Sequence, residues 1–244
     1  MIPLYTYPGS TWGEVFALAK ANPKIPVMTI INPDSGPGTK MDTNYLAGVL
    51  KLRAAGVGVL GYVSTSYASR DLSAVRSCVR AYKNWYPVNG IFFDEMSNIP
   101  GRERYYSVLD GYAKSLGFSH TMGNPGVDVP PSYIGTLDTF VIHESEGLPS
   151  ASLLRGWHSD FAKSNFAAIA YGMQDLDEPS LAAASPYLGY VYVTNAGLPN
   201  PYASLPPYLA SIAGALENAT KLYKRRLAEN ALERSAVTEG AAAL

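Results

Sequence analysis

The chain has little of the chemistry that marks several common classes of protein. Its single cysteine, Cys78, excludes an intramolecular disulfide and a zinc site built on paired thiolates. The 3 histidines show neither an H-x-H nor an H-E-x-x-H spacing, so we expect no catalytic metal and no cofactor. The sequence lacks a G-x-S-x-G motif and a phosphate loop that ends in Lys-Ser or Lys-Thr, which argues against an α/β-hydrolase and a P-loop nucleotide-binding protein.

Charge and long apolar runs are also limited. Lys and Arg total 19, Asp and Glu total 20, and charged residues make up only 16% of the 244 residues. This balance provides no basic face for nucleic acid or for an anionic membrane surface. No apolar run is long enough to span a bilayer. We therefore expect no nucleic-acid partner and no membrane partner, and we expect a monomer.

Apolar and aromatic residues are abundant instead. Hydrophobic residues make up 47% of the chain, which is enough for one large core, and there are 18 tyrosines. A tyrosine combines an apolar ring with a polar tip, which suits concave sites for polar ligands such as sugars. The last five residues, 240–244, are typical of a cloning-vector remnant, so we expect residues 227–244 to be a helical or disordered tail. We further expect an extracellular or cell-surface protein whose signal sequence has been removed.

Short apolar runs rich in β-forming residues alternate with helical patterns along the chain. Strands are predicted at Ile2–Tyr7, Ile25–Ile31, Val57–Ser64, Gly90–Glu95, Phe118–Gly123, Thr139–Glu144, Phe166–Gly172 and Gly189–Thr194. Helices are predicted at Trp12–Lys20, Tyr45–Ala55, Leu72–Trp85, Arg102–Leu116 and Pro206–Arg226. This alternation implies parallel strands joined by crossover helices, and eight such units predict an α/β protein, a (β/α)8 TIM barrel with residues 1–226 as a single domain. A doubly wound open sheet is the alternative, but no phosphate loop follows the first strand.

Two of the predicted strands end in acidic residues. Asp94 and Glu95 close one strand, and Glu144 closes another, with Glu146 shortly beyond it. The active site of a TIM barrel lies at the C-terminal ends of its strands. Carboxylates at that depth are unfavourable unless they have partners or a function. The structural alternative is that Asp94 or Glu95 caps the next helix or pairs with an arginine.

The alternation of side chains along a strand relates the two acidic sites. Asp94 falls on the same side as Phe92, and Glu144 falls on the same side as Phe140 and Ile142. We therefore expect Asp94 and Glu144 to face each other across the barrel mouth. Glycoside hydrolysis uses such a pair, because one group protonates the leaving oxygen while the other attacks the anomeric carbon or activates water.

Other residues at the strand ends are candidates for binding a sugar. Glu146 is the competitor to Glu144, although we expect it to be a solvated acid in a loop. We expect tyrosines at the mouth, Tyr67 among them, to stack on sugar rings. The candidate substrate-binding residues are Tyr7, Asn32, Tyr62, Asn124, Tyr192 and Asn195.

Short motifs spread over nearly the whole chain resemble the spherulin-4 family. They are Ile2-Pro-Leu-Tyr-Thr-Tyr-Pro8, Asn32-Pro-Asp-Ser-Gly-Pro-Gly38, Gly61-Tyr-Val-Ser-Thr65, Gly90-Ile-Phe-Phe-Asp-Glu95, Gly123-Asn-Pro-Gly126 and Tyr192-Val-Thr-Asn195. The resemblance implies a TIM-barrel glycoside hydrolase that cleaves α-1,4-linked N-acetylgalactosamine within a microbial exopolysaccharide such as galactosaminogalactan.

The resemblance also implies roles for the acidic residues. Asp94 would be the nucleophile, Glu144 the acid/base, and Glu95 a residue that tunes the site or holds the sugar. The sequence departs from the family pattern around Glu144, where His143 precedes it and Glu146 follows closely. Because the family includes proteins known only as encystment or spherulation products, a non-catalytic carbohydrate-binding or cell-wall protein on the same barrel is the alternative.

Overall fold

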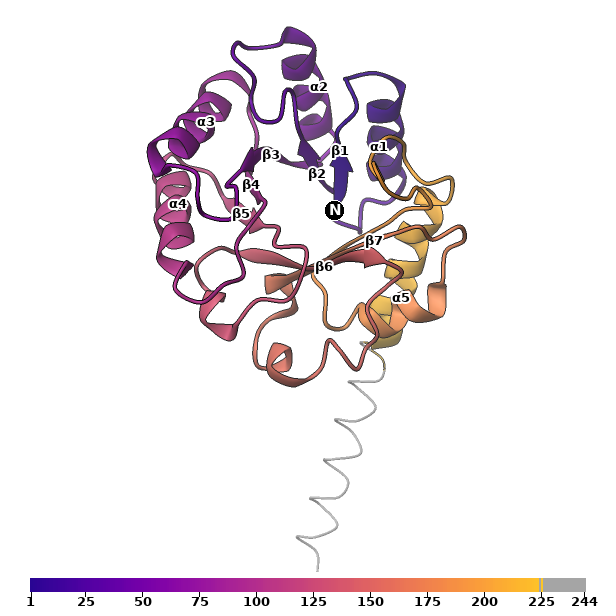
Figure 1. The fold of residues 1–244 in the computed structure, drawn as a ribbon. Coiled ribbons are helices and arrows are strands. Elements are labelled where there is room, and N and C mark those ends of the chain that lie inside the picture. Colours follow the sequence, from indigo (N-terminus) through magenta and orange to yellow (C-terminus); the bar gives the residue numbers. More distant parts are fainter. Residues whose placement is uncertain (224, 226–244) are drawn as a thin grey trace, which may run out of the picture.

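The computed structural model describes residues 1–223 and 225, and it contains one sheet of eight parallel strands in sequential order. The strands are β1 (Ile2–Leu4), β2 (Met28–Ile31), β3 (Gly58–Ser64), β4 (Gly90–Asp94), β5 (His120–Gly123), β6 (Thr139–Glu146), β7 (Phe166–Tyr171) and β8 (Tyr190–Val193). The helices are α1 (Ser10–Ala21), α2 (Thr43–Ala54), α3 (Leu72–Trp85), α4 (Glu103–Ser115) and α5 (Glu178–Ala184), and residues 209–223 form a further helix. The helices surround the strands (Figure 1), which confirms the predicted TIM barrel. The expected tail at 227–244 lies outside the described residues.

The register of the strands decides which side chains face the barrel interior. Ser64 of β3 pairs with Asp94 of β4, so these two side chains share one face of the sheet. Gly61 lies on the opposite face, where a Cβ atom would come within 2.6 Å of the Tyr82 ring of α3. Ser64 and Asp94 therefore point away from the helices and toward the barrel interior.

Two of the crossovers contain no α-helix. Between β5 and β6 the chain forms a short 3-10 turn at Pro131–Tyr133, and between β6 and β7 it forms two such turns, at Gly156–Asp160 and Lys163–Asn165. Pro130 precedes the first turn and Pro131 begins it, and proline lacks the N–H that a helix interior requires. The Tyr133 side chain is fully buried, and its hydroxyl donates to the Ile99 carbonyl at 2.6 Å.

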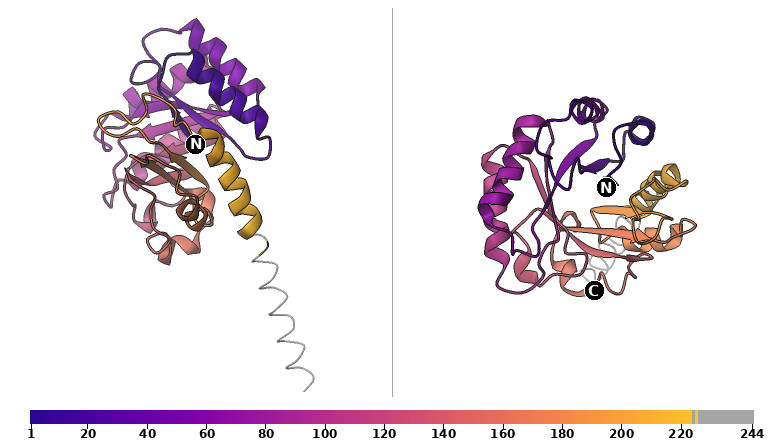
Figure 2. Two further views of the ribbon diagram at one scale, coloured as in Figure 1. Left: turned by 90° about the vertical axis from the view of Figure 1, so that its right-hand side faces the viewer. Right: turned by 45° about the horizontal axis from the view of Figure 1, so that its top comes forward.

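The last helix covers the seam between the last and first strands. No ladder of hydrogen bonds joins β8 to β1 within residues 1–223, although the backbone nitrogen of Met1 lies 3.1 Å from the Val191 carbonyl oxygen. Residues 209–223 pack over this seam between α5 and α1 and bury Ile212 and Ala213 (Figures 1 and 2). No helix within the described part of the chain is both long and apolar enough to cross a membrane.

Strand β6 differs from its prediction in two ways. It extends to Glu146 rather than ending at Glu144, so Glu146 lies in the strand and not in a loop, although its side chain is exposed. Val141 pairs with Ala167 of β7 and His143 pairs with Ala168, which leaves the intervening residue of β6 without a partner. This is a β-bulge, which reverses the alternation of side chains beyond it.

The bulge changes the reason why Glu144 faces inward. Phe140 pairs with Phe166, whereas Glu144 pairs with Ile169, so the two side chains lie on opposite faces of the sheet. The prediction that Phe140 and Glu144 share a face is therefore wrong. Strict alternation would have turned Glu144 toward the helices, and the bulge turns it toward the interior.

Candidate active site

Residues at the ends of three neighbouring strands meet at the barrel mouth. Asp94 ends β4, Asn124 directly follows β5, and Glu144 lies in β6. The Asn124 amide nitrogen lies 2.9 Å from Asp94 Oδ1 and 2.6 Å from Glu144 Oε2. A carboxamide nitrogen carries two hydrogens, so Asn124 can donate one to each carboxylate. The two acids that were selected from separate strands therefore share one donor.

The position of Asn124 is held by its backbone and by its own side chain. Its backbone N–H donates to the Phe93 carbonyl at 2.8 Å, and its carbonyl accepts from the Met96 N–H at 2.9 Å. Its side-chain oxygen accepts from the Gly126 N–H at 3.0 Å. Because that contact requires the oxygen, the amide nitrogen must face the two acids. Gly126 has φ +71°, which glycine adopts without strain.

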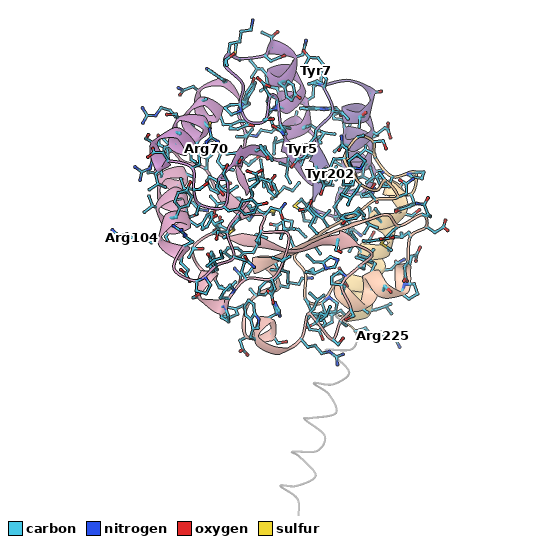
Figure 3. The ribbon with its side chains drawn as sticks, in the orientation of Figure 1. Tyr5, Tyr7, Arg70, Arg104, Tyr202 and Arg225 are labelled. Carbon is cyan, nitrogen blue, oxygen red and sulfur yellow. The ribbon has the colours of Figure 1, made fainter. Side chains whose placement is uncertain are left out.

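Three tyrosines complete a ring around the acids. The Tyr62 hydroxyl donates to Asp94, and the Tyr202 hydroxyl donates to Glu144 Oε1. The Tyr5 ring lies between them, 5.8 Å from the Tyr62 ring and 5.4 Å from the Tyr202 ring, in edge-on contact with both. Figure 3 shows Tyr5 and Tyr202 near the centre of the barrel. Each acid thus accepts one tyrosine hydroxyl and one hydrogen of the shared amide.

The acids of this ring are stabilised by neutral donors. No ion pair within residues 1–223 includes Asp94, Glu95 or Glu144. Burial raises the pKa of Asp94 from its ordinary value, and the negative charge of Glu144 adds to the increase, while the hydrogen bonds from Tyr62 and Asn124 oppose it. Burial and the charge of Asp94 also raise the pKa of Tyr5 well above its usual range, so Tyr5 is neutral at physiological pH.

Glu95 points toward a neighbouring strand rather than into the ring. Its carboxylate accepts a hydrogen bond from the Ser64 hydroxyl and lies 3.3 Å from the Ser66 hydroxyl. Helix α4 begins at Glu103 with no side-chain cap, so neither Asp94 nor Glu95 caps it. The structural alternative for these two acids therefore has no support in the described residues.

Glu146 and Glu144 occupy different positions on the same face of β6. Glu146 pairs with Tyr171, two residues beyond the pair of Glu144 with Ile169, so both acids face inward. Glu146 is exposed at the rim, whereas Glu144 is half-buried and makes the contact with Asn124. The geometry therefore favours Glu144 as the partner of Asp94.

Two candidate binding residues lie outside the ring. Tyr7 is 56% exposed, and its hydroxyl lies 3.0 Å from Asp42 Oδ2 and 2.7 Å from the Asn44 amide nitrogen, at the start of α2 (Figure 3). The Asn32 side-chain oxygen accepts from the Gly36 N–H at 2.7 Å, so Asn32 stabilises a turn.

The other four candidates occupy three different surroundings. Tyr62 and Asn124 belong to the ring. Tyr192 is only 1% exposed and its ring lies 6.5 Å from the Tyr202 ring, so the prediction that it stacks on a sugar is wrong. Asn195 is half-buried, and its carbonyl accepts from the Gln174 side chain at 3.2 Å.

Two residues of the ring were not selected from the sequence. Tyr5 was placed within the first predicted strand, but β1 ends at Leu4, so Tyr5 is the first residue of the mouth. Its position next to a strand end was the available signal. Tyr202 lies in the irregular segment between β8 and the last helix, where no periodic pattern indicates which side chain turns inward.

Comparisons with known proteins agree with this architecture. Residues 1–216 match the family described as spherulation-specific family 4. Spherulin-4 of Physarum polycephalum is 33% identical over 234 residues, which cover 88% of this chain and 69% of that protein. The crystal structure of Aspergillus clavatus Sph3 in complex with GalNAc is similar with a TM-score of 0.76 and 24% identity, covering 88% of this chain and 95% of that one. At this level of identity, the structural match supports the fold.

Proposed function

The chain belongs to spherulation-specific family 4, and from this premise we propose that it is a glycoside hydrolase that cleaves within an exopolysaccharide. The substrate would contain α-1,4-linked N-acetylgalactosamine or galactosamine, as galactosaminogalactan does. The observation that carries the proposal is the shared contact of the Asn124 amide with Asp94 and Glu144 at the barrel mouth. The GalNAc bound to the similar Sph3 supports the choice of sugar. A substrate of this kind implies an extracellular or cell-surface location.

The closeness of the two acids supports a retaining mechanism. The carboxyl groups of retaining glycosidases are about 5–5.5 Å apart, and those of inverting glycosidases are roughly 6.5–9.5 Å apart. One nitrogen lies 2.9 Å from an oxygen of Asp94 and 2.6 Å from an oxygen of Glu144. These two oxygens are therefore closer together than the inverting geometry requires. In a retaining mechanism one carboxylate forms a covalent bond to the anomeric carbon, and the other protonates the leaving oxygen and then activates water.

We assign Asp94 as the nucleophile and Glu144 as the acid/base. The hydrogen bonds from Tyr62 and Asn124 stabilise the ionised form of Asp94, which a nucleophile needs. Burial acts in the other direction, because it raises the pKa of Asp94 and so favours its use as an acid. Glu95 would position the end of β3 through its contact with Ser64.

The test is product release from galactosaminogalactan and from other exopolysaccharides, measured by mass spectrometry for wild type, Asp94→Asn and Glu144→Gln. We expect the wild type to release oligosaccharides from the galactosamine-containing polymer and both variants to be severely impaired. Glu144→Gln should still cleave substrates with a good leaving group, because these need little protonation, whereas Asp94→Asn should not. The reverse pattern would exchange the two roles. Binding of the polymer without release at any pH would contradict hydrolysis and support a carbohydrate-binding protein.

A further inference from the structure

The turn after β3 holds three consecutive residues in the left-handed region of backbone conformation. Ser66, Tyr67 and Ala68 have φ of 44°, 56° and 63°, and Glu95 beside them has φ 49°. Within the described residues, only Ser35 is a further non-glycine residue with positive φ. Residues with a Cβ atom avoid this region because Cβ approaches the following carbonyl oxygen, and a run of them is rarer than a single one. Such strain persists only where the surroundings impose it.

Hydrogen bonds to the end of β4 impose this conformation. The Thr65 hydroxyl lies 3.0 Å from the Asp94 carbonyl oxygen and 2.8 Å from the Glu95 carbonyl oxygen. The Tyr67 N–H donates to the Glu95 carbonyl at 2.6 Å, and Ala68 is buried. The turn is therefore fastened to the residue that follows Asp94, next to the acid pair.

The Tyr67 side chain contributes little to the fold. It is 64% exposed, and within the described part of the chain it makes no hydrogen bond or ring contact. Glycine would adopt the same backbone conformation without strain. The chain thus places a large ring at a position where a residue without a side chain would fit better. Since the fold does not use the ring, the ring is available to contact a ligand.

Tyr67 differs from the other tyrosines of the mouth in this respect. Tyr62 and Tyr202 bind the two acids, Tyr5 packs between their rings, and the hydroxyl of Tyr7 is bound to the start of α2. Each of these side chains has a partner in the protein.

We propose that Tyr67 forms a subsite for one hexopyranose unit of the polysaccharide, outside the two units joined by the bond that is cleaved. The identity of the polymer rests on the proposed function. The apolar C–H face of the sugar would lie on the Tyr67 ring, and the phenolic hydroxyl would bind a sugar hydroxyl. Because hydrogen bonds to the end of β4 already hold the turn, little backbone freedom is lost on binding.

Binding is measured by affinity electrophoresis in gels that contain galactosaminogalactan, with Asp94→Asn as the parent so that the polymer is not cut. In this parent, Tyr67→Ala should weaken retention roughly two- to tenfold, the range for loss of one aromatic contact, and Tyr67→Trp should preserve it. Tyr223→Ala is the matched control, because Tyr223 is also exposed but lies on the last helix. Retention of Tyr67→Ala equal to this control, or no retention of the parent, overturns the proposal.

A second comparison separates the ring from the strain. Tyr67→Gly and Tyr67→Ala both lack the ring, so they should lose the same affinity. Tyr67→Gly should unfold at a higher urea concentration than Tyr67→Ala, because it alone relieves the left-handed strain. Equal midpoints would contradict a strained platform.

The outcomes also separate this subsite from the proposed function. If wild type cleaves the polymer while Tyr67→Ala binds like the control, the hydrolase stands and the subsite falls. If wild type cleaves nothing but retention depends on Tyr67, the subsite stands and the hydrolase falls. In an active enzyme, the loss caused by Tyr67→Ala should be larger for long oligosaccharides than for short ones, because only long ones reach the subsite.

Discussion

The two ends of the barrel carry carboxylates in contrasting surroundings. At the mouth, Asp94 accepts hydrogen bonds from Tyr62 and Asn124, which are neutral, and its pKa is raised mainly by burial. At the base, Asp138 forms an ion pair with Lys114 and accepts from the Thr121 N–H at 2.8 Å. Burial opposes ionisation there too, but these bonds and the charge of Lys114 lower the pKa of Asp138. The acid at the base is paired with a cation, whereas within the described residues the acids at the mouth have no cationic partner.

This difference indicates which acid stabilises the fold and which acids are suited to a chemical function. A carboxylate with a cation and several donors is stable in its ionised form and strengthens the fold. Two carboxylates that share only neutral donors repel each other, so the mouth keeps an arrangement that does not favour the folded state by itself. Perturbed acids of this kind are typical of sites that do chemistry.

The largest effect is expected at the mouth, from Asp94→Asn. We expect turnover of the polymer to fall by at least about 10³-fold, because the amide cannot act as a nucleophile. The free energy of unfolding should stay the same or increase, since one of two like charges is removed. Urea unfolding and product release measured on the same preparation check both parts. A variant that loses stability together with activity would mean that Asp94 is a structural acid like Asp138.

The matching change at the base is Asp138→Asn, and it should have the opposite result. We expect the free energy of unfolding to fall by about 1–3 kcal/mol, because the variant loses the charged acceptor of the Lys114 ammonium and of the Thr121 N–H. Activity per folded molecule should remain that of the wild type. Urea unfolding and rates normalised to the concentration of folded protein provide the measurement. A loss of turnover without a loss of stability would contradict a purely structural role for Asp138.

A smaller effect is expected from Tyr202→Phe, which removes one donor from the mouth. The Tyr202 hydroxyl donates a hydrogen bond to Glu144 Oε1 and so holds the orientation of this carboxyl group. We expect kcat/KM for the polymer to fall by roughly tenfold to 10²-fold in this variant, because a displaced acid/base group no longer meets the leaving oxygen in the productive geometry. Tyr105→Phe, which removes a hydroxyl that donates to the Arg70 carbonyl, is a matched control and should keep the wild-type rate. An unchanged rate in Tyr202→Phe would exclude a positioning role for Tyr202.

The arrangement of strands could be predicted from the sequence because it follows from local patterns. Each strand is a short apolar run between turn-forming or helical segments, and the acids Asp94 and Glu144 interrupt such runs at their ends. The inward direction of Glu144 could not be derived in the same way. Phe140, Val141 and Ile142 are all apolar, so the pattern contains no alternation that would reveal the bulge. The expected position was reached although the assumed alternation was wrong.

The remainder of the ring depends on tertiary structure. Tyr202 reaches Glu144 from 58 positions further along the chain, through a segment without periodicity. Tyr192 was selected because it lies near a strand end, but residues placed around it by the barrel bury it completely. Proximity to a strand end indicates the mouth, and only packing decides whether a side chain is exposed there.

The smallest predicted effect is a pH dependence of stability that arises at the base. His120 lies among Asp138, Lys114 and Asp110, and its pKa is lowered from 6.5 mainly by burial, with the charge of Lys114 acting in the same direction and the two aspartates against it. The imidazole is therefore neutral at neutral pH, and its 3.7 Å contact with Asp138 is not an ion pair there.

Because the unfolded chain binds the proton more readily, the stability due to His120 is complete above its unfolded pKa of 6.5 and is lost as the pH falls below it. Asp138 adds its own loss only below 3.8, but the buried Met1 amino group, whose pKa is lowered from 8.0 to about 5, also titrates between pH 7.5 and pH 5. The contribution of the histidine is therefore the difference between wild type and His120→Gln in urea unfolding at these two pH values. The free energy of unfolding should fall more between these two conditions in wild type than in His120→Gln, which cannot titrate. The acid limb of the activity profile, which reports the mouth, should be the same in both proteins, and a shift of that limb would show that the two ends are coupled.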